Sequence, residues 1–387
     1  MRWTVLVCLL VTAPAAAEPP ITNRDYAIDF YEGTAIGDTR MVGMGGTGLA
    51  LIPGSAGTLL NASAPAVRQA TDNDSWSWDW HFDYLNGRLS SDFDNNGEAL
   101  DDATGAQLGT VGLAFRRGKW AAAIVGSAQT APIDGAADLD AQNLRVRIAV
   151  ARWFERIDTS IGIGVQSIAF QILTPDEAMF DISGGGLIAG ATWLPRMENF
   201  RVAGTLESAI IGGDVKTEAC DPMACMVEGS TRSYILPNQV ESSFRTGAGF
   251  AYRWAETAWN QQVRAKFRDE LSVTAAADVW VTGASKNGYG IEKFGVQELQ
   301  RSGSHANVGA RAGVEVEALP GRLRLRVGAY WEPARFNGVG GRMHGTFGVE
   351  GRVFEFQLWG TRRGRLGVTT DIASRYRNIA LSIGFWH

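Results

Sequence analysis

The chain has 387 residues, including 47 glycines, 13 tryptophans and 17 phenylalanines, and 20% of its residues are charged. A mean hydropathy of -0.07 is too low for a bundle of membrane-spanning helices, each of which needs roughly 18 or more consecutive apolar residues. A net charge of -5, without a dense run of lysine and arginine, argues against nucleic acid as a partner. The composition favours strands and turns over helices.

The first seventeen residues have the features of an export signal. Arg2 supplies a positive charge, residues 4–12 are apolar, and three alanines, Ala15 to Ala17, precede Glu18. We therefore expect residues 1–17 to be a signal peptide that is removed before Glu18.

Residues 18–74 contain no convincing strand pattern but are rich in glycine and alanine, whereas from residue 75 onward apolar and polar residues alternate with a period of two. Trp76, Trp78 and Trp80, for example, alternate with Ser77 and Asp79. Such alternation is typical of half-buried strands. It predicts fourteen strands, near residues 75–85, 107–117, 119–128, 142–154, 158–172, 184–194, 199–211, 241–254, 270–282, 304–317, 322–332, 344–358, 365–370 and 376–386.

The connections between these strands alternate between long, Gly- and Asp-rich loops and tight turns. Sorting of long and short connections to opposite ends is typical of outer-membrane barrels, with the short turns and both termini in the periplasm. We therefore predict an all-β, transmembrane antiparallel barrel over residues 75–387. One connection, residues 255–269, has Trp259, Val263 and Phe267 at four-residue spacing, which predicts a short amphipathic helix lying on the inner leaflet or on the barrel rim.

The polar parity of these strands should face the lumen, because arginine at the membrane midplane costs roughly 2 to 4 kcal/mol. Its charges either hold an anionic ligand head group or form an ion-pair lattice that stiffens the wall, and we favour the lattice. The main candidates for head-group contact are Arg145, Arg147, Arg322, Arg324 and Arg326; further lumen charges are Arg245, Arg253, Arg311, Arg352, Asp79, Asp83, Asp278, Glu315, Glu317 and Glu350.

The segment before the barrel resembles the N-terminal hatch of the FadL-like superfamily of long-chain fatty-acid and hydrophobic-compound transporters. The matching residues are Arg40, Gly43, Gly45, Gly46 and Asn61, with Pro65 standing later than the proline the motif places directly after the asparagine. The resemblance is strongest over residues 37–67. It implies that residues 18–74 plug a barrel too wide for its own side chains to fill.

The resemblance also implies import of hydrophobic, fatty-acid-like compounds by diffusion through the plugged barrel, without chemistry or cofactor. The same superfamily includes PorV-type secretion barrels, so the alternative is a secretion-associated or structural barrel whose extracellular loops bind protein. The expected location is the bacterial outer membrane, among its lipids and lipopolysaccharide. The chain end, Phe385 to His387, resembles the signal read by the barrel-insertion machinery, with Trp386 and His387 in place of the usual final phenylalanine.

Three weaker patterns remain. Asp92, Asp94 and Asn96 match the first half of a calcium loop, but such residues are also ordinary turn formers, which is the interpretation we prefer. Cys220 and Cys225 lie close together, and in an exported protein they predict a local disulfide more than a zinc site. His81 shares a strand face with Asp79 and Asp83, but no nucleophile motif accompanies it, so we expect no enzyme.

Overall fold

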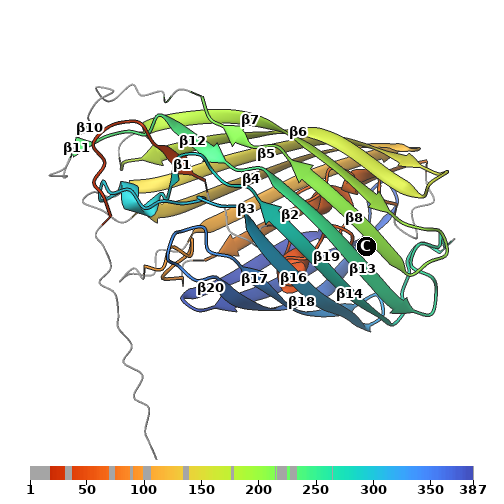
Figure 1. The fold of residues 1–387 in the computed structure, drawn as a ribbon. Helices are drawn as coiled ribbons and strands as arrows, with labels where there is room; N and C mark the ends of the chain where they lie inside the picture. Colours follow the sequence, from red (N-terminus) through yellow and green to blue (C-terminus); the bar gives the residue numbers. More distant parts are fainter. Residues whose placement is uncertain are drawn as a thin grey trace, which may run out of the picture.

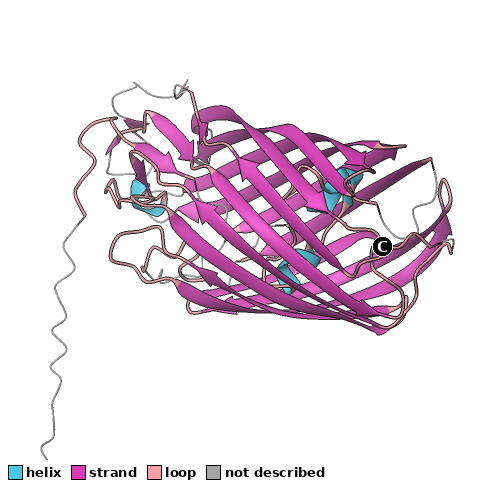
Figure 2. Ribbon diagram, turned by 45° about the vertical axis from the view of Figure 1, so that its right-hand side comes forward, coloured by secondary structure: helices cyan, strands magenta, loops and turns pink. Residues whose placement is uncertain are grey.

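The computed structural model describes residues 18–30, 37–68, 75–87, 90–98, 106–133, 139–175, 178–213, 215, 225–226, 233–263 and 265–386. Its main feature is a closed barrel of fourteen antiparallel strands (Figures 1 and 2). The expected signal peptide, residues 1–17, lies outside the described residues. Among the helices that are described, none is long and apolar enough to cross a membrane.

The barrel strands follow one another around the wall in chain order, and the last one, β20, pairs with the first, β2. That pairing closes the circle. Strands β8 and β13 also pair with each other, although four short strands outside the barrel come between them in the chain. The strands are β2 (Trp76–Asn86), β3 (Gln107–Arg117), β4 (Trp120–Ile133), β5 (Leu139–Phe154), β6 (Thr159–Leu173), β7 (Ala178–Trp193), β8 (Phe200–Glu207), β13 (Arg245–Ala255), β14 (Ser272–Thr282), β16 (Asn307–Leu319), β17 (Leu323–Glu332), β18 (Arg342–Gln357), β19 (Thr361–Ala373) and β20 (Tyr376–Phe385).

The predicted count of fourteen strands is confirmed, and the differences lie at strand ends. The predicted strand 199–211 divides into β8 and a short β9 (Ile210–Ile211), and the start of the predicted strand 241–254 belongs to a separate strand, β12 (Gln239–Ser242). The predicted strand 365–370 is longer at both ends. The predicted helix over 255–269 is wrong, because the described residues of this connection form turns and bends.

The outer face of the barrel is apolar. Alternate residues on the strands, such as Ile163, Leu187 and Val327, are more than half exposed, while their neighbours in sequence face inward. Closure of the circle gives each barrel strand a paired neighbour on both sides, which is what strands need to cross a hydrocarbon layer. The outer surface is therefore suited to lipid contact.

A small second sheet lies at the long-loop end of the barrel. Its central strand, β1 (Ala27–Asp29), pairs in parallel with β12 and with β15 (Gly288–Tyr289), and β12 also pairs with β9. A two-stranded ribbon, β10 (Cys225–Met226) and β11 (Ser233–Tyr234), belongs to the same group of loops. The start of the described chain is thereby fixed among loops that follow β8 and β14.

Residues 37–68, which we call the interior segment, lie inside the barrel (Figure 1, orange). The segment has two short helices, α1 (Thr39–Gly43) and α2 (Gly54–Gly57), and a 3-10 turn, η1 (Ala64–Ala66). Helix α1 contacts β17 to β20, α2 contacts β2 to β4, and η1 contacts β3 to β6. The segment therefore reaches across the lumen and contacts most of the wall.

Candidate functional site in the barrel interior

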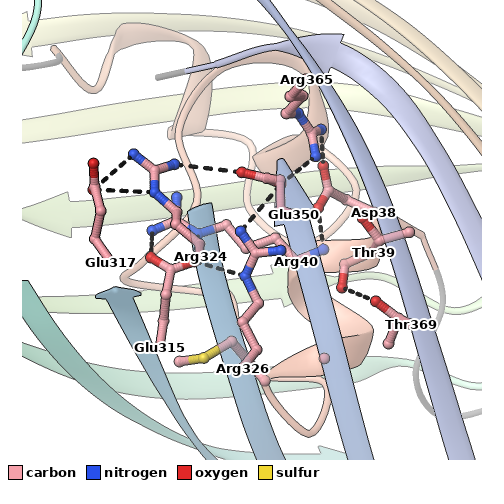
Figure 3. A network of polar contacts seen from close by, with 12 residues as sticks. Asp38, Thr39, Arg40, Glu315, Glu317, Arg324, Arg326, Glu350, Arg365 and Thr369 are labelled. Atoms are coloured by element: carbon pink, nitrogen blue, oxygen red, sulfur yellow. Dashed lines mark hydrogen bonds and ion pairs between the residues drawn. The ribbon is translucent and has the colours of Figure 1, made fainter. Parts of the chain in front are cut away.

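A network of ion pairs joins the interior segment to the barrel wall (Figure 3). Arg40 on α1 donates from Nε and Nη2 to the two carboxylate oxygens of Glu315, at 2.9 and 2.6 Å. Asp38 caps α1 by accepting from the backbone N–H of Arg40, and its other oxygen lies 2.6 Å from Nη2 of Arg365. Both residues that flank the start of α1 are thus bonded to opposite charges on the wall.

The register of three strands creates the wall's half of this network. Glu315 on β16 lies directly opposite Arg326 on β17, and Glu317 lies opposite Arg324. Arg324 in turn lies opposite Glu350 on β18. The resulting distances are 2.7 Å for Arg326 to Glu315, 3.0 Å for Arg326 to Glu350 and 3.2 Å for Arg324 to Glu317. Since opposite charges face each other across strands and are buried, removal of one member leaves an uncompensated charge.

A second charged cluster lies on β5 and β8. Arg147 makes two contacts with Glu207, at 3.3 and 3.0 Å, and also donates to the backbone carbonyl of Leu59 in the interior segment. Arg145 donates to Gln166 at 3.2 Å and lies 4.0 Å from Glu207. The segment is therefore bonded to the wall on this side as well.

The five arginines predicted for head-group contact thus divide into two groups. Arg145, Arg147, Arg324 and Arg326 are buried inside the barrel and lie beside carboxylates, whereas Arg322 is exposed in the turn before β17. For Arg322 the expectation of an inward side chain is wrong, because the strand begins one residue later. Three members of the two clusters were missed from sequence, Asp38, Glu207 and Arg365, although Arg365 shares the inward parity of Thr369.

The glycines of the motif permit close approach of the interior segment to the wall. Gly45 and Gly46 have positive φ angles of 66° and 75°. On the wall, a Cβ at Gly328 would lie 2.2 Å from the backbone nitrogen of Gly45, and one at Gly313 would lie 2.3 Å from the carbonyl oxygen of Met44. Because only glycine lacks a side chain, these contacts require it at both wall positions.

The other two motif residues shape the second half of the segment. Asn61 accepts from the N–H and hydroxyl of Ser63, at 3.0 and 2.8 Å, and donates to Thr192 on β7 at 3.2 Å. The side chain of Asn61 thus closes a turn without a proline at the next position. Pro65 lies inside η1.

The cluster predicted around His81 also contacts the interior segment. Ser55, at the start of α2, lies 2.9 Å from Nδ1 of His81 and donates its hydroxyl to Asp79 at 2.8 Å. Asp83 accepts from the N–H of Thr39 at 3.2 Å. The side chains of Asp79, His81 and Asp83 on β2 thus anchor the interior segment. The side chain of Ser55, which bonds two of them, is fully buried.

The inner face changes character toward the long-loop end, where it is apolar. Ile168, Phe170 and Ile172 on β6 point inward and form one cluster with residues of the second sheet, including Ile28 of β1 and Val240 of β12. Sequence reasoning missed this lining because it assigned only one parity of each strand to apolar contact. The signal was present, since both parities of residues 168–173 are largely apolar.

A small cavity lies beside this cluster. Its volume is about 50 Å³, and it is lined by Ile28 and Phe30 of the N-terminal residues, by Phe93, and by Gln129 and Phe170 of the wall, among others. Among the described residues, the Oε1 atom of Gln129 is buried there without a hydrogen-bond partner. Sites for small organic ligands usually measure about 300 to 1,000 Å³. The cavity, at about 50 Å³, is therefore smaller than such a ligand needs.

The calcium candidate forms a tight turn in the structure. Asp92 and Asp94 both accept from the N–H of Asn96, at 3.0 and 3.1 Å, and the side chain of Asn96 donates to Glu292. Within the described ranges, no group of three or more histidine, cysteine, aspartate or glutamate side chains is arranged to hold a metal ion. Cys225 is on β10, and Cys220 lies outside the described residues, so their disulfide stays a prediction.

The class defined by these observations is a fourteen-strand barrel with an apolar outer face and a chain segment within its lumen. No family model matches the sequence, and no curated protein matches it. Solved structures do match, with TM-scores of 0.50 for a Pseudomonas aeruginosa FadL homologue, 0.51 for the Ralstonia pickettii toluene transporter TbuX and 0.54 for the P. putida toluene transporter TodX.

These likenesses extend over nearly the whole chain at low sequence identity. The identities are 13%, 12% and 11%, and the alignments cover 92%, 91% and 92% of this chain and 98% of each of the others. The chain therefore has the fold of the FadL-like hydrophobic-compound transporters, as the hatch motif and strand count predict.

Proposed function

We propose that this protein resides in the bacterial outer membrane and imports hydrophobic compounds by diffusion, with residues 18–74 acting as its hatch. The long loops then face the outside, the short turns face the periplasm, and the outer face contacts lipid and lipopolysaccharide after the barrel-insertion machinery has folded the chain. The fold supports this proposal, and no covalent chemistry is needed.

The observation that carries the proposal is the apolar inner lining at the long-loop end. Ile168, Phe170 and Ile172 offer a compound an apolar surface on the inner face of the wall. Burial of each CH2 group contributes roughly 0.8 kcal/mol, so acyl chains and aromatic hydrocarbons would partition into this region from water. Because the cavity is small, entry of a compound requires residues 28–30 to move away from Phe170.

The test is import of a neutral compound by two matched variants. Phe170→Gln places an amide in the apolar lining, whereas Phe250→Gln makes the same change on the outer face, where Phe250 is 47% exposed. We expect Phe170→Gln to lower binding of radiolabelled toluene or decane in zwitterionic nanodiscs, and uptake by intact cells, with little effect of Phe250→Gln. Equal uptake by cells with and without the barrel would refute the proposal.

The protein purified from its own membrane separates the proposal from the alternative. A stoichiometric hydrophobic ligand, detected by native mass spectrometry and absent from detergent blanks, supports import. An empty barrel that copurifies with a protein would instead favour the secretion-associated or structural function.

A further inference from the structure

A row of aromatic and cationic residues lies on the outer face of the barrel, at its short-turn end. Strand pairing places Trp76 on β2 opposite Arg117 on β3, and Arg117 opposite Trp120 on β4. Arg152 on β5 lies on the other side of Trp120. Trp120 is 55% exposed, and both arginines are exposed as well. Because residues paired across strands share one face of the sheet, rings and cations alternate along this row on the lipid-facing side.

The two arginines of the row have no direct counterion. Arg152 leans over aromatic rings, and its guanidinium carbon lies 5.0 Å from the ring centre of Trp120 and 5.2 Å from that of Phe154. Among the described residues, neither arginine forms an ion pair. The acid next to the row, Glu155, pairs with Lys119 at 2.9 Å. The positive charge of the row is therefore open to a ligand that approaches from outside the barrel.

A hollow lies on the same outer face, nearer the middle of the strands. Its volume is about 750 Å³. Every lining residue is hydrophobic or glycine, and the lining includes Trp80 on β2, Leu113 on β3, Ile124 on β4 and Val146 on β5. These are the same four strands that carry the row. The hollow therefore offers an apolar surface directly alongside the two unpaired cations.

The row and the hollow are spaced as the head and the tail of one lipid molecule are. Arg117 precedes the short turn by one residue and is four residues from Leu113, while Trp120 is four residues from Ile124. At about 3.3 Å per residue, this separation is roughly 13 Å along the strands. One leaflet contributes about 15 Å of hydrocarbon to a bilayer. When the row lies at the level of the head groups, the hollow therefore lies at the level of the acyl chains.

From these observations we propose that the outer face of β2 to β5 binds an anionic phospholipid of the inner leaflet. Its phosphate group lies between Arg117 and Arg152, beside the ring of Trp120, and one of its acyl chains lies in the hollow. Arginine binds phosphate through paired N–H groups, tryptophan favours the level of the head groups, and clustered cations beside a membrane attract anionic lipids.

The charge of the row selects the head group. A zwitterionic head group carries its own cation, which two unpaired arginines repel, whereas phosphatidylglycerol has a net negative charge. The proposal rests on the proposed membrane location of the barrel, but it does not depend on import.

The test compares phosphatidylglycerol and phosphatidylcholine, both with oleoyl chains, as ligands of the full-length protein in detergent micelles, using native mass spectrometry. We expect phosphatidylglycerol to bind about five- to tenfold more tightly. Arg117→Gln and Arg152→Gln should each weaken its binding about fivefold and leave phosphatidylcholine binding unchanged. Arg322→Gln is the matched control, because Arg322 is exposed at the same barrel end, in the turn before β17.

A second pair of variants tests the position of the acyl chain. Gly126 lines the hollow, and a Cβ at this position would have Cγ1 of Val111, at 3.9 Å, as its nearest neighbour. Gly126→Leu therefore fills the hollow without a clash at Cβ, and should weaken binding of both lipids about fivefold. Gly204→Leu makes the same change on β8, where the nearest atom to a Cβ is 3.7 Å away, and should have no effect.

Three results would overturn the proposal. Phosphatidylglycerol would bind no more tightly than phosphatidylcholine, or Arg152→Gln and Arg322→Gln would bind it equally, or a dimer without lipid would form, which would make a second copy of the chain the occupant of the hollow. Toluene uptake by cells that carry Arg152→Gln should stay unchanged. Failure of the lipid site and failure of the proposed import are therefore distinguishable.

Discussion

Glu315 accepts hydrogen bonds from two arginines that come from different parts of the chain. Arg40 reaches it from the interior segment, and Arg326 reaches it from the neighbouring strand at 2.7 Å. One carboxylate therefore belongs both to the wall and to the attachment of the segment.

This sharing predicts unequal effects of two neutral substitutions. Arg40→Gln leaves Glu315 paired with Arg326, so we expect a loss of about 1.5 to 3 kcal/mol in the free energy of unfolding. Glu315→Gln leaves two arginines facing an amide and should cost about 3 to 5 kcal/mol. Urea unfolding in phosphatidylcholine bilayers measures both values. If Arg40→Gln lowered the free energy of unfolding more than Glu315→Gln does, the prediction would be wrong. The Arg40–Glu315 pair would then matter to the interior segment and not to the wall.

The close approach at Gly328 predicts that an added methyl group displaces the interior segment. Gly328→Ala would place Cβ against the backbone nitrogen of Gly45, and such overpacking typically costs about 1 to 3 kcal/mol. Hydrogen exchange of residues 41–47 should become faster. Gly345→Ala is the control, since no atom lies within 4 Å of the added Cβ there. Unchanged exchange in Gly328→Ala would contradict the observed contact.

The turn at residues 92–97 should be sensitive to pH. Burial, together with the negative charges of Glu292 and Asp92, raises the pKa of Asp94 well above its usual range. The folded turn therefore binds a proton more strongly than the open turn does, and its stability is greatest at low pH and falls as pH rises through the raised pKa.

Hydrogen exchange of residues 90–98 between pH 4 and pH 8 tests this dependence. Asp94→Asn, which cannot ionise, should remove much of it, while the turn hydrogen bond from Asn96 can be kept through the amide oxygen. If the variant and the natural protein show the same pH profile, Asp94 is not the group responsible.

The disulfide predicted between Cys220 and Cys225 gives a chemical test. Neither thiol should react with iodoacetamide in the unfolded, non-reduced protein, and both should react after reduction. Cys220→Ser should then expose Cys225 to the reagent without reduction. Labelling of both cysteines before reduction would show that the pair is not bonded in the exported protein.

The sequence by itself determined the barrel. Strand alternation is a local property: each of the residues Trp76 to Tyr84 faces the lumen or the lipid according to its parity, whatever the rest of the chain does. The strand count and the sorting of loops could therefore be predicted, and so could the face of Arg145, Arg147, Arg324 and Arg326. The prediction that Arg322 faces the lumen was wrong, because the turn, and not the alternating pattern, sets where the strand begins.

Only the tertiary structure decided which partners these residues have. The helix predicted at 255–269 does not form because Arg268 bonds the carbonyl oxygens of Thr257, Ala258 and Trp259, which a helix would need for its own N–H groups. In the same way, Arg40 meets Glu315 across 275 residues of sequence. Such contacts depend on strand register and on the path of the interior segment, and no local pattern encodes either.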